Sequence, residues 1–474
     1  MYKSTFMGLN TALRGVLAHQ NALDVTGHNI SNLNTAGYTR QRAEMVTAPA
    51  WSNPSAFSQV TPGQMGTGVE VLRIERLRDQ FIDVNVRQQF GRQAYAQTLV
   101  EQLSQVEAAF QEPGENGVAR LMNNFWSAMD AVASNPQDPG ARQAFVAAAD
   151  ALATGFRQVS ADLQNIADQS NRRLDATVNE VNDISQRIAS LNGEIRNAVE
   201  HRHQPNDLLD ERDRLMDQLS KLINFTSTEA ANGEVSITFG TTTPIGLVDP
   251  LVAGGSTPIT RAELDSAFAN GDLRSGRAFA DESLWDPTTG IIPAYMAQLD
   301  QLVASFVVGV NVAHAGGTDI AGGAGGDLFT ATGMTAASIT VDAAILGDYR
   351  LVAASSSAPG PAEPGNGGNF ASMLDTLRNA AQGAPLNGSW EGFYTSIVTG
   401  TGARAQTAQR ALSNSDILVS MAVGRREQVS GVSLDEEMSN MLRFQHAYNA
   451  SARVMTTMDD ALDTIINRMG RVGL

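Results

Sequence analysis

Residues 433–469 read SLDEEMSNMLRFQHAYNASARVMTTMDDALDTIINRM, and the spacing of their apolar side chains decides the fold. From position 434 the series alternates steps of four and three, and nine of its eleven positions are apolar. Such sustained spacing indicates a coiled-coil seam. Ser433 followed by Glu436 is a capping box, so a helix is predicted to begin there. The larger seam members are Leu434, Met438, Met441, Tyr448, Met455, Leu462, Ile466 and Met469.

The beginning of the chain repeats this pattern. Between positions 6 and 30 the same alternating steps give six apolar residues out of eight, which are Phe6, Leu9, Leu13, Val16, Leu23 and Ile30. Each end offers a narrow stripe with no third element nearby in sequence to cover it. The two helices either pair only with each other or pair with each other and with further copies of the chain. We favour the second hypothesis, and we expect the ends to be loose in a free monomer.

The middle of the chain is predicted to be mainly helical. Breaks are expected at Pro113-Gly114, Asn135-Pro136 and Gln204-Pro205. The expected helices are 91–110, 117–133, 140–202, 207–224, 291–315, 369–382 and 389–429. The expected strands are Glu44–Val46, Gly68–Ile74, Glu234–Phe239, Ile245–Val252 and Ala337–Val352. The loop composition of 355–368 completes a prediction of a mainly α fold with smaller β parts.

This pattern suggests three domains. We expect a terminal coiled-coil domain from 1–40 with 430–474. An elongated helical bundle is expected from 41–225 with 285–330 and 369–429. A small β-rich outer domain is expected from 226–284 with 331–368.

Composition excludes several function classes. The formal net charge of −17 argues against nucleic acid as a partner, because phosphate binding needs a cationic surface. The absence of cysteine excludes thiol catalysis, thiolate zinc sites and disulfides. No apolar run reaches about 18 residues, so no membrane span is expected. Polar residues interrupt the first 30 positions, so we expect no Sec-type signal.

Three stretches of the sequence could hold a metal or a catalytic group, and each has a simpler structural explanation. His201 and His203 flank Arg202 beside a predicted helix end, and no further metal ligands are in view. The acidic stretch NDLLDERDR at 206–214 fits an amphipathic helix start with ion pairs. The stretch GGAGGDLFT at 322–330 resembles one copy of a calcium-binding nonapeptide, a repeat that works only when stacked. We expect no catalytic residue, cofactor or metal, and infer a scaffold protein.

Residues 28–41, HNISNLNTAGYTRQ, resemble the N-terminal signature of the bacterial flagellar rod, hook and hook-associated proteins. The motif residues are Asn29, Asn32, Asn34, Thr35, Gly37, Tyr38 and Arg40. The stretches 66–90, 205–225, 299–329 and 430–469 are also similar to this axial family. Hook and rod members have mainly β middles, whereas 91–224 is predicted to be helical here. The resemblance therefore favours a hook-associated member at the hook–filament junction over a hook or distal rod subunit. A secreted calcium-binding enzyme, suggested only by 322–330, is a remote alternative.

The resemblance implies an extracellular ring of copies whose terminal helices 1–33 and 433–474 line an inner tube. Implied partners are the hook protein, the third hook-associated protein on the filament side, and a chaperone of the type III export apparatus. The turn 34–40 would connect the inner helix to the outer parts. Asn34 and Gly37 are expected to take left-handed backbone angles, and Tyr38 to give its hydroxyl a polar partner. Arg40 and Arg42 are expected to meet carboxylates of an adjacent subunit.

Overall fold

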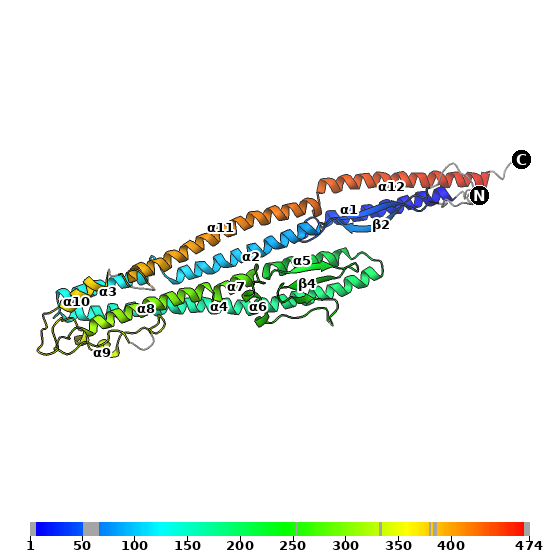
Figure 1. Cartoon of the computed structure of the whole chain (residues 1–474). Coiled ribbons are helices and arrows are strands. Elements are labelled where there is room, and N and C mark those ends of the chain that lie inside the picture. The colour runs from blue at the N-terminus through cyan, green and yellow to red at the C-terminus, as the bar shows by residue number, and fades with distance from the viewer. Residues whose placement is uncertain are drawn as a thin grey trace.

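The computed structural model describes residues 6–50, 66–252, 254–330, 334–378, 381–382 and 386–468. The chain forms a long, narrow body in which both ends lie at the same tip (Figure 1). The longer helices are α1 (Met7–Ser31), α2 (Gln80–Ala109), α3 (Val118–Ser134), α4 (Pro139–Glu200), α5 (Asn206–Leu222), α8 (Ile291–Ala315), α11 (Trp390–Ser430) and α12 (Leu434–Asp463). The shorter ones are α6 (Arg261–Ala269), α7 (Arg277–Trp285), α9 (Ala343–Gly347), η1 (Tyr349–Leu351), α10 (Gly368–Leu377) and the π-helical η2 (Thr464–Arg468). The mainly α prediction is confirmed.

The strands form two small antiparallel sheets. β1 (Gln41–Thr47) and β2 (Val69–Arg76) make a hairpin with a register shift between Glu44 and Met45, and it packs on α1. β3 (Thr226–Glu229), β4 (Val235–Phe239) and β5 (Ile245–Val248) make a sheet in sequence order. In both sheets, every strand therefore pairs with the strand next to it in the chain.

Helix α4 runs for 62 residues, and both apolar cores of the body lie along it. The side chain of Asp138 caps its first turn by accepting a bond from the Gly140 amide, and Pro139 occupies the first helical position. It ends at His201, after which Arg202 has a φ of 60°. All three predicted breaks are confirmed, since Pro113, Pro136 and Pro205 each lie in the connection between two helices.

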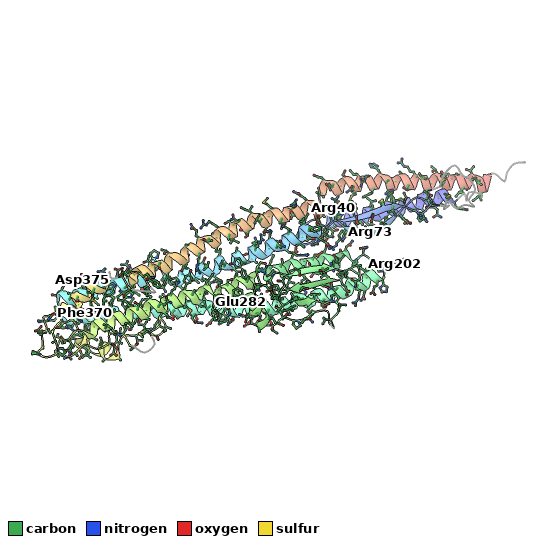
Figure 2. All side chains as sticks on the ribbon, viewed as in Figure 1. Arg40, Arg73, Arg202, Glu282, Phe370 and Asp375 are labelled. Atoms are coloured by element: carbon green, nitrogen blue, oxygen red, sulfur yellow. The ribbon has the colours of Figure 1, made fainter. Side chains whose placement is uncertain are left out.

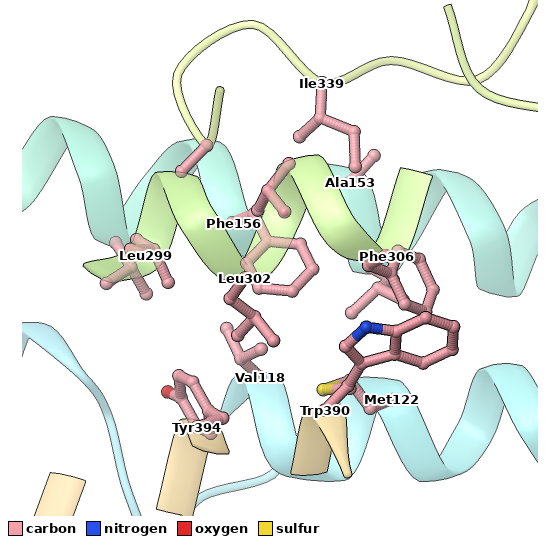
Figure 3. Packing of buried hydrophobic residues seen from close by; sticks show 14 of the residues in the cluster. Val118, Met122, Ala153, Phe156, Leu299, Leu302, Phe306, Ile339, Trp390 and Tyr394 are labelled. Carbon is pink, nitrogen blue, oxygen red and sulfur yellow. The ribbon is translucent and has the colours of Figure 1, made fainter. Parts of the chain in front are cut away.

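Two apolar cores follow one another along α4. In the first core, α3, the N-terminal half of α4, α8 and the beginning of α11 meet. At its aromatic centre Phe306 contacts both Phe156 and Trp390 (Figure 3). Trp390 in turn stacks on Trp126 at a centroid distance of 6.1 Å. In the second core, the C-terminal half of α4, α5, β4, β5 and α6 meet. Helix α8 is apolar enough to resemble a membrane span, but its buried side lies in the first core.

Two predictions about the β parts are wrong. Residues 337–352 were expected to form a strand, but they form α9 and η1, which Asp342 and Asp348 cap. Their apolar side chains enter the first core one at a time instead of pairing in a ladder. The segment 226–284 packs in the second core and contains α6 and α7, so it does not share one outer domain with 331–368. The predicted strand 245–252 ends at Val248, where Asp249 accepts a bond from the Leu251 amide and starts a turn.

Helix α7 lies where the two cores meet and buries two adjacent carboxyl groups. Asp281 is 0% exposed and Glu282 is 1% exposed. Figure 2 places Glu282 midway along the body. Asp281 pairs with Arg173 of α4, and Arg261 of α6 lies 3.3 Å from Glu282. Burial first, and then the hydrogen bond with Asp265, raise the pKa of Glu282 to about 8.

We expect the stability of the protein to fall as pH rises from about 5 to about 8, and the substitution Glu282→Gln to flatten that fall. A carboxyl whose pKa is raised from 4.5 to about 8 on folding binds its proton more tightly in the native state. Stability is then greatest below the unfolded pKa and is lost up to the folded pKa. Urea unfolding midpoints at pH 5 and pH 8 test this. Parallel pH profiles for both proteins would contradict it.

Candidate assembly interface

Asn29 joins four segments at the base of the terminal helices. Its side chain is 1% exposed and lies in the last turns of α1. The amide nitrogen donates to the Gln41 carbonyl at 2.8 Å and to Glu437 of α12 at 3.1 Å. The amide oxygen accepts from the Tyr38 hydroxyl at 2.7 Å and from the Gln41 amide at 3.0 Å. All four hydrogen-bonding positions of this amide are filled, which fixes the approach of the segments it joins.

Arg40 ties the turn to the beginning of α12. Its guanidinium lies 2.6 Å from Glu436 and 2.7 Å from Glu437, and its backbone amide donates to the Ser430 carbonyl at 2.9 Å. Glu437 is buried, so this pair is shielded from solvent. Both Arg40 and Arg42 pair with carboxylates of their own chain, Arg42 with Glu75, and their contact with an adjacent subunit stays a prediction. Figure 2 shows Arg40 at the point where α11 gives way to α12.

Other predicted features of the motif are met only in part. Gly37 has a φ of 85°, as expected, but Asn34 is not among the described residues with positive φ. Asn32 and Thr35 bond to each other at 3.1 Å in an exposed turn away from Asn29. Ser433 begins α12 without a capping bond from its side chain, and the carboxylate of Glu436 is engaged with Arg40. The structure thus gathers Asn29, Tyr38 and Arg40 around Glu437.

A cluster of buried ion pairs continues from the turn into the bundle. The Thr39 amide donates to Asp210 at 3.0 Å, and Arg76 bridges Asp210 and Asp213 at 2.8 and 2.9 Å. Asp213 also accepts from Arg78 and Arg87, and Asp217 of α5 accepts from Arg87 and from Arg426 of α11. The ion pairs expected in 206–214 are present. Their partners from β2, α2 and α11 were not predicted, because nothing local in sequence indicates them.

Asp213 is held ionised by its neighbours. Burial alone raises its pKa, but the guanidinium groups of Arg78, Arg76 and Arg87 outweigh burial and hold the pKa below the usual value. Burial, followed by the charges of Asp210, Asp207 and Glu437, raises the pKa of Tyr38, so this tyrosine stays neutral and donates to Asn29.

We expect Asp213→Asn to cost about 3–5 kcal/mol of stability, because three buried arginines each lose one of their two carboxylates. The contribution of Asp213 is complete above its unfolded pKa and is lost as pH falls through the lower folded pKa. The matched control is Glu211→Gln, whose ion pair with Arg214 is 35% exposed on the Glu211 side, with an expected cost under about 1 kcal/mol. Denaturant unfolding at pH 7 measures both. Equal costs would contradict the prediction.

The face on which α1 meets α12 is made of small residues. Gly8 of α1 faces Met458 of α12 and Gly15 faces Ser451, while Ala12, Gly15, Ala18 and Ala22 are buried between α1 and its neighbours. A side chain at Gly15 would come within 2.9 Å of Ser451, so the two helices approach closely. The predicted seam is instead divided. Phe6, Leu13, Leu434, Met438 and Ile466 are exposed; Leu9, Val16, Leu23, Ile30, Met441, Tyr448 and Met455 are half-buried; Leu462 is buried; Met469 lies outside the described residues.

Flagellar proteins are similar in sequence to this chain over nearly its whole length. The chain is 32% identical over 514 residues to flagellar hook-associated protein 1 of Bacillus subtilis (strain 168), with 98% of this chain and 99% of the relative covered. The chain belongs to the flagellar hook-associated protein 1 family. The family member of Escherichia coli (strain K12) is 25% identical over 561 residues, covering 97% of this chain and 99% of that one. That alignment is longer than the 474 residues here, so the relative contains segments that this member lacks.

Family models divide the chain in a way that fits this assignment. The model described as flagellar hook-associated protein FlgK helical domain matches residues 103–329. Models of the flagella basal body rod protein and of the flagellar basal body rod FlgEFG protein C-terminal match 9–39 and 426–469. The structure of the flagellar hook junction protein FlgK from Burkholderia pseudomallei aligns with a TM-score of 0.58 at 16% identity, covering 74% of this chain and all of that one. The fold of the hook-associated protein 1 family is thus shared at low identity.

Proposed function

We propose that this structural component of the flagellum forms a ring of copies at the junction between hook and filament. Membership of the hook-associated protein 1 family supports a flagellar role, and the Burkholderia pseudomallei relative is titled a hook junction protein. The chain acts as a mechanical connector and carries out no reaction. Its place is outside the cell, reached through the flagellar export apparatus.

The exposed apolar stripe of the terminal helices is the observation that carries this proposal. Leu13, Leu434, Met438 and Ile466 are 43%, 48%, 47% and 67% exposed on helices that are otherwise paired through small residues. Burying one such side chain contributes roughly 1.5–3 kcal/mol, so neighbouring copies gain stability by covering the stripe. The contacts of Asn29 and Arg40 hold the beginning of α12 against α1 and β1.

The partners follow from this place in the flagellum. We propose contacts with further copies of the chain, with the hook protein on one side, and with the third hook-associated protein and the filament on the other. An export chaperone holds the C-terminal helix before assembly.

In the free monomer, amides of 440–465 should exchange fast with solvent, because their apolar stripe has no cover. Strong protection of these amides would contradict the prediction that the C-terminal helix is loose before assembly.

Deletion of the gene tests the proposed function. Cells lacking it should build hooks without filaments and release monomeric filament protein into the medium, and a plasmid copy should restore filaments. Filaments that stay attached without the protein would overturn the junction role. A hook or distal rod subunit would give a different result, since its loss removes the hook itself.

A further inference from the structure

The outer face of α11 carries an apolar stripe that nothing in the described chain covers. Ile417, Leu418 and Met421 are 59%, 44% and 67% exposed, and we call these three the α11 stripe. Arg425 follows Met421 one turn later, is exposed, and makes no ion pair with any carboxylate of the described residues. Clustered exposed apolar side chains beside a free cation mark a surface built for a partner.

A second apolar surface lies at the beginning of α2. Phe81 is 89% exposed and Val84 is 46% exposed. Val84 borders a hollow of about 240 Å³ between α2, α5 and β3, whose apolar walls include Ile223 and Phe225. We call Phe81 and this space the α2 hollow. Phe81 lies one helical turn before Val84, outside the lining of the hollow, and an exposed aromatic side chain beside a depression with apolar walls offers a receiving surface for a partner.

The two surfaces face away from each other. The arm formed by α2 and α11 is antiparallel (Figure 1). Phe90 of α2 lies between α11 and α5, with Arg426 5.9 Å and Lys221 5.0 Å from its ring. Gly91 points instead to α5 and α7, since a side chain there would meet Ser220 and Ser275. Val84, seven residues before Gly91, shares that second direction because seven residues make about two turns. A copy therefore cannot fill its own hollow.

The α11 stripe and the α2 hollow also lie at nearly the same level along the paired helices α2 and α11. Gln93 of α2 bonds to Asp416 of α11 at 2.8 Å, which fixes the level of one helix against the other. Counting along the antiparallel pair, Met421 is level with position 88, four positions from Val84, a shift of about 6 Å. The same shift brings Arg425 level with position 80, next to Asp79. Asp79 is exposed, caps α2 by accepting from the Phe81 amide, and has no ion-pair partner among the described residues.

We propose that the α11 stripe of one copy docks in the α2 hollow of the next copy around the ring. Two different, complementary surfaces on opposite sides make a head-to-tail contact, and such contacts generate rings when the rotation closes. The charge match of Arg425 with Asp79 adds to the burial of Met421 against Val84. The contact continues the terminal-helix interface, since α11 leads into α12 within three residues. This inference rests on the proposed ring.

Cysteine cross-linking tests the contact, because the chain has no cysteine of its own. The double variant Met421→Cys with Val84→Cys, assembled on flagella of the deletion strain and mildly oxidised, should give a ladder of disulfide-linked multimers on non-reducing gels. Neither single variant should give this ladder. A second pair in the same register, Ile417→Cys with Gln88→Cys, covers the case in which the first pair folds poorly.

The outcomes separate this contact from the junction role. If filaments attach normally and neither double variant gives a ladder, the docking contact is overturned while the junction role stands. If filaments attach without the protein, the junction role fails first. Met421→Asp should reduce filament attachment at least tenfold, whereas Leu251→Asp, at a side chain 94% exposed on a distant loop, should leave it unchanged. Equal effects of these two substitutions would also overturn the contact.

Discussion

Replacing Arg40 with alanine should loosen the base of the terminal helices, whereas replacing Arg42 should change little. Arg40→Ala leaves the carboxylate of Glu437, 3% exposed, without its cation, and breaking a buried pair in this way costs about 3–5 kcal/mol. Arg42 is 62% exposed and pairs with Glu75 at the surface, where an ion pair contributes under about 1 kcal/mol.

Amide exchange gives the measurement. Protection of β1 and of residues 434–440 should drop on the order of 100-fold in Arg40→Ala, since a loss of about 3 kcal/mol corresponds to that factor. The bundle around Trp126 and Phe306 should keep its protection, because it forms a separate core. Arg42→Ala is the control from the same motif. Similar exchange in both variants would show that the buried pair of Arg40 with Glu437 does not stabilise the contact between the turn and the beginning of α12.

The sequence predicts the long helices because their signals are local. The breaks at proline and the apolar periodicity of α4 lie within a few residues of what they specify. The same local reasoning fails at 337–352, where Ile339, Val341 and Ile345 are β-forming residues. Tertiary packing on α4 and α8 overrides this preference. Helix α6 was missed although Thr260 and Glu263 form a capping box that was available in the sequence.

The candidate interface was only half predictable. The motif around Tyr38 was identified, but its partner Glu437 is 399 positions away in the chain, and no spacing rule links the two. Charge patterning alone could not assign Arg40, which satisfies a carboxylate of its own chain. Periodicity located the terminal stripe but did not show which side faces inward. Close helix approach selects Gly8 and Gly15 for the side that meets α12 and leaves Leu13 outside.

Because several of the larger apolar side chains of the predicted seam are exposed and do not lie between α1 and α12, Met438 is the sharpest test of the seam as an assembly surface. Its side chain is 47% exposed in the chain, so Met438→Asp should leave thermal unfolding of the monomer unchanged. In the ring the same substitution places a charge in a covered apolar contact. Each copy then loses roughly 1.5–3 kcal/mol of burial and also bears the desolvation of a carboxylate. Because every contact around the ring carries the defect, filament attachment should be abolished.

Motility in soft agar and electron microscopy of hook ends measure this effect. Met438→Leu keeps an apolar side chain of similar volume and should support normal swimming. Leu251→Asp again serves as the matched control, since it places the same charge at an exposed leucine far from the terminal helices. Normal motility of Met438→Asp would refute the seam as an assembly surface. A destabilised monomer would instead mean that Met438 is covered within the chain, because only a side chain already packed there can lose contacts before assembly.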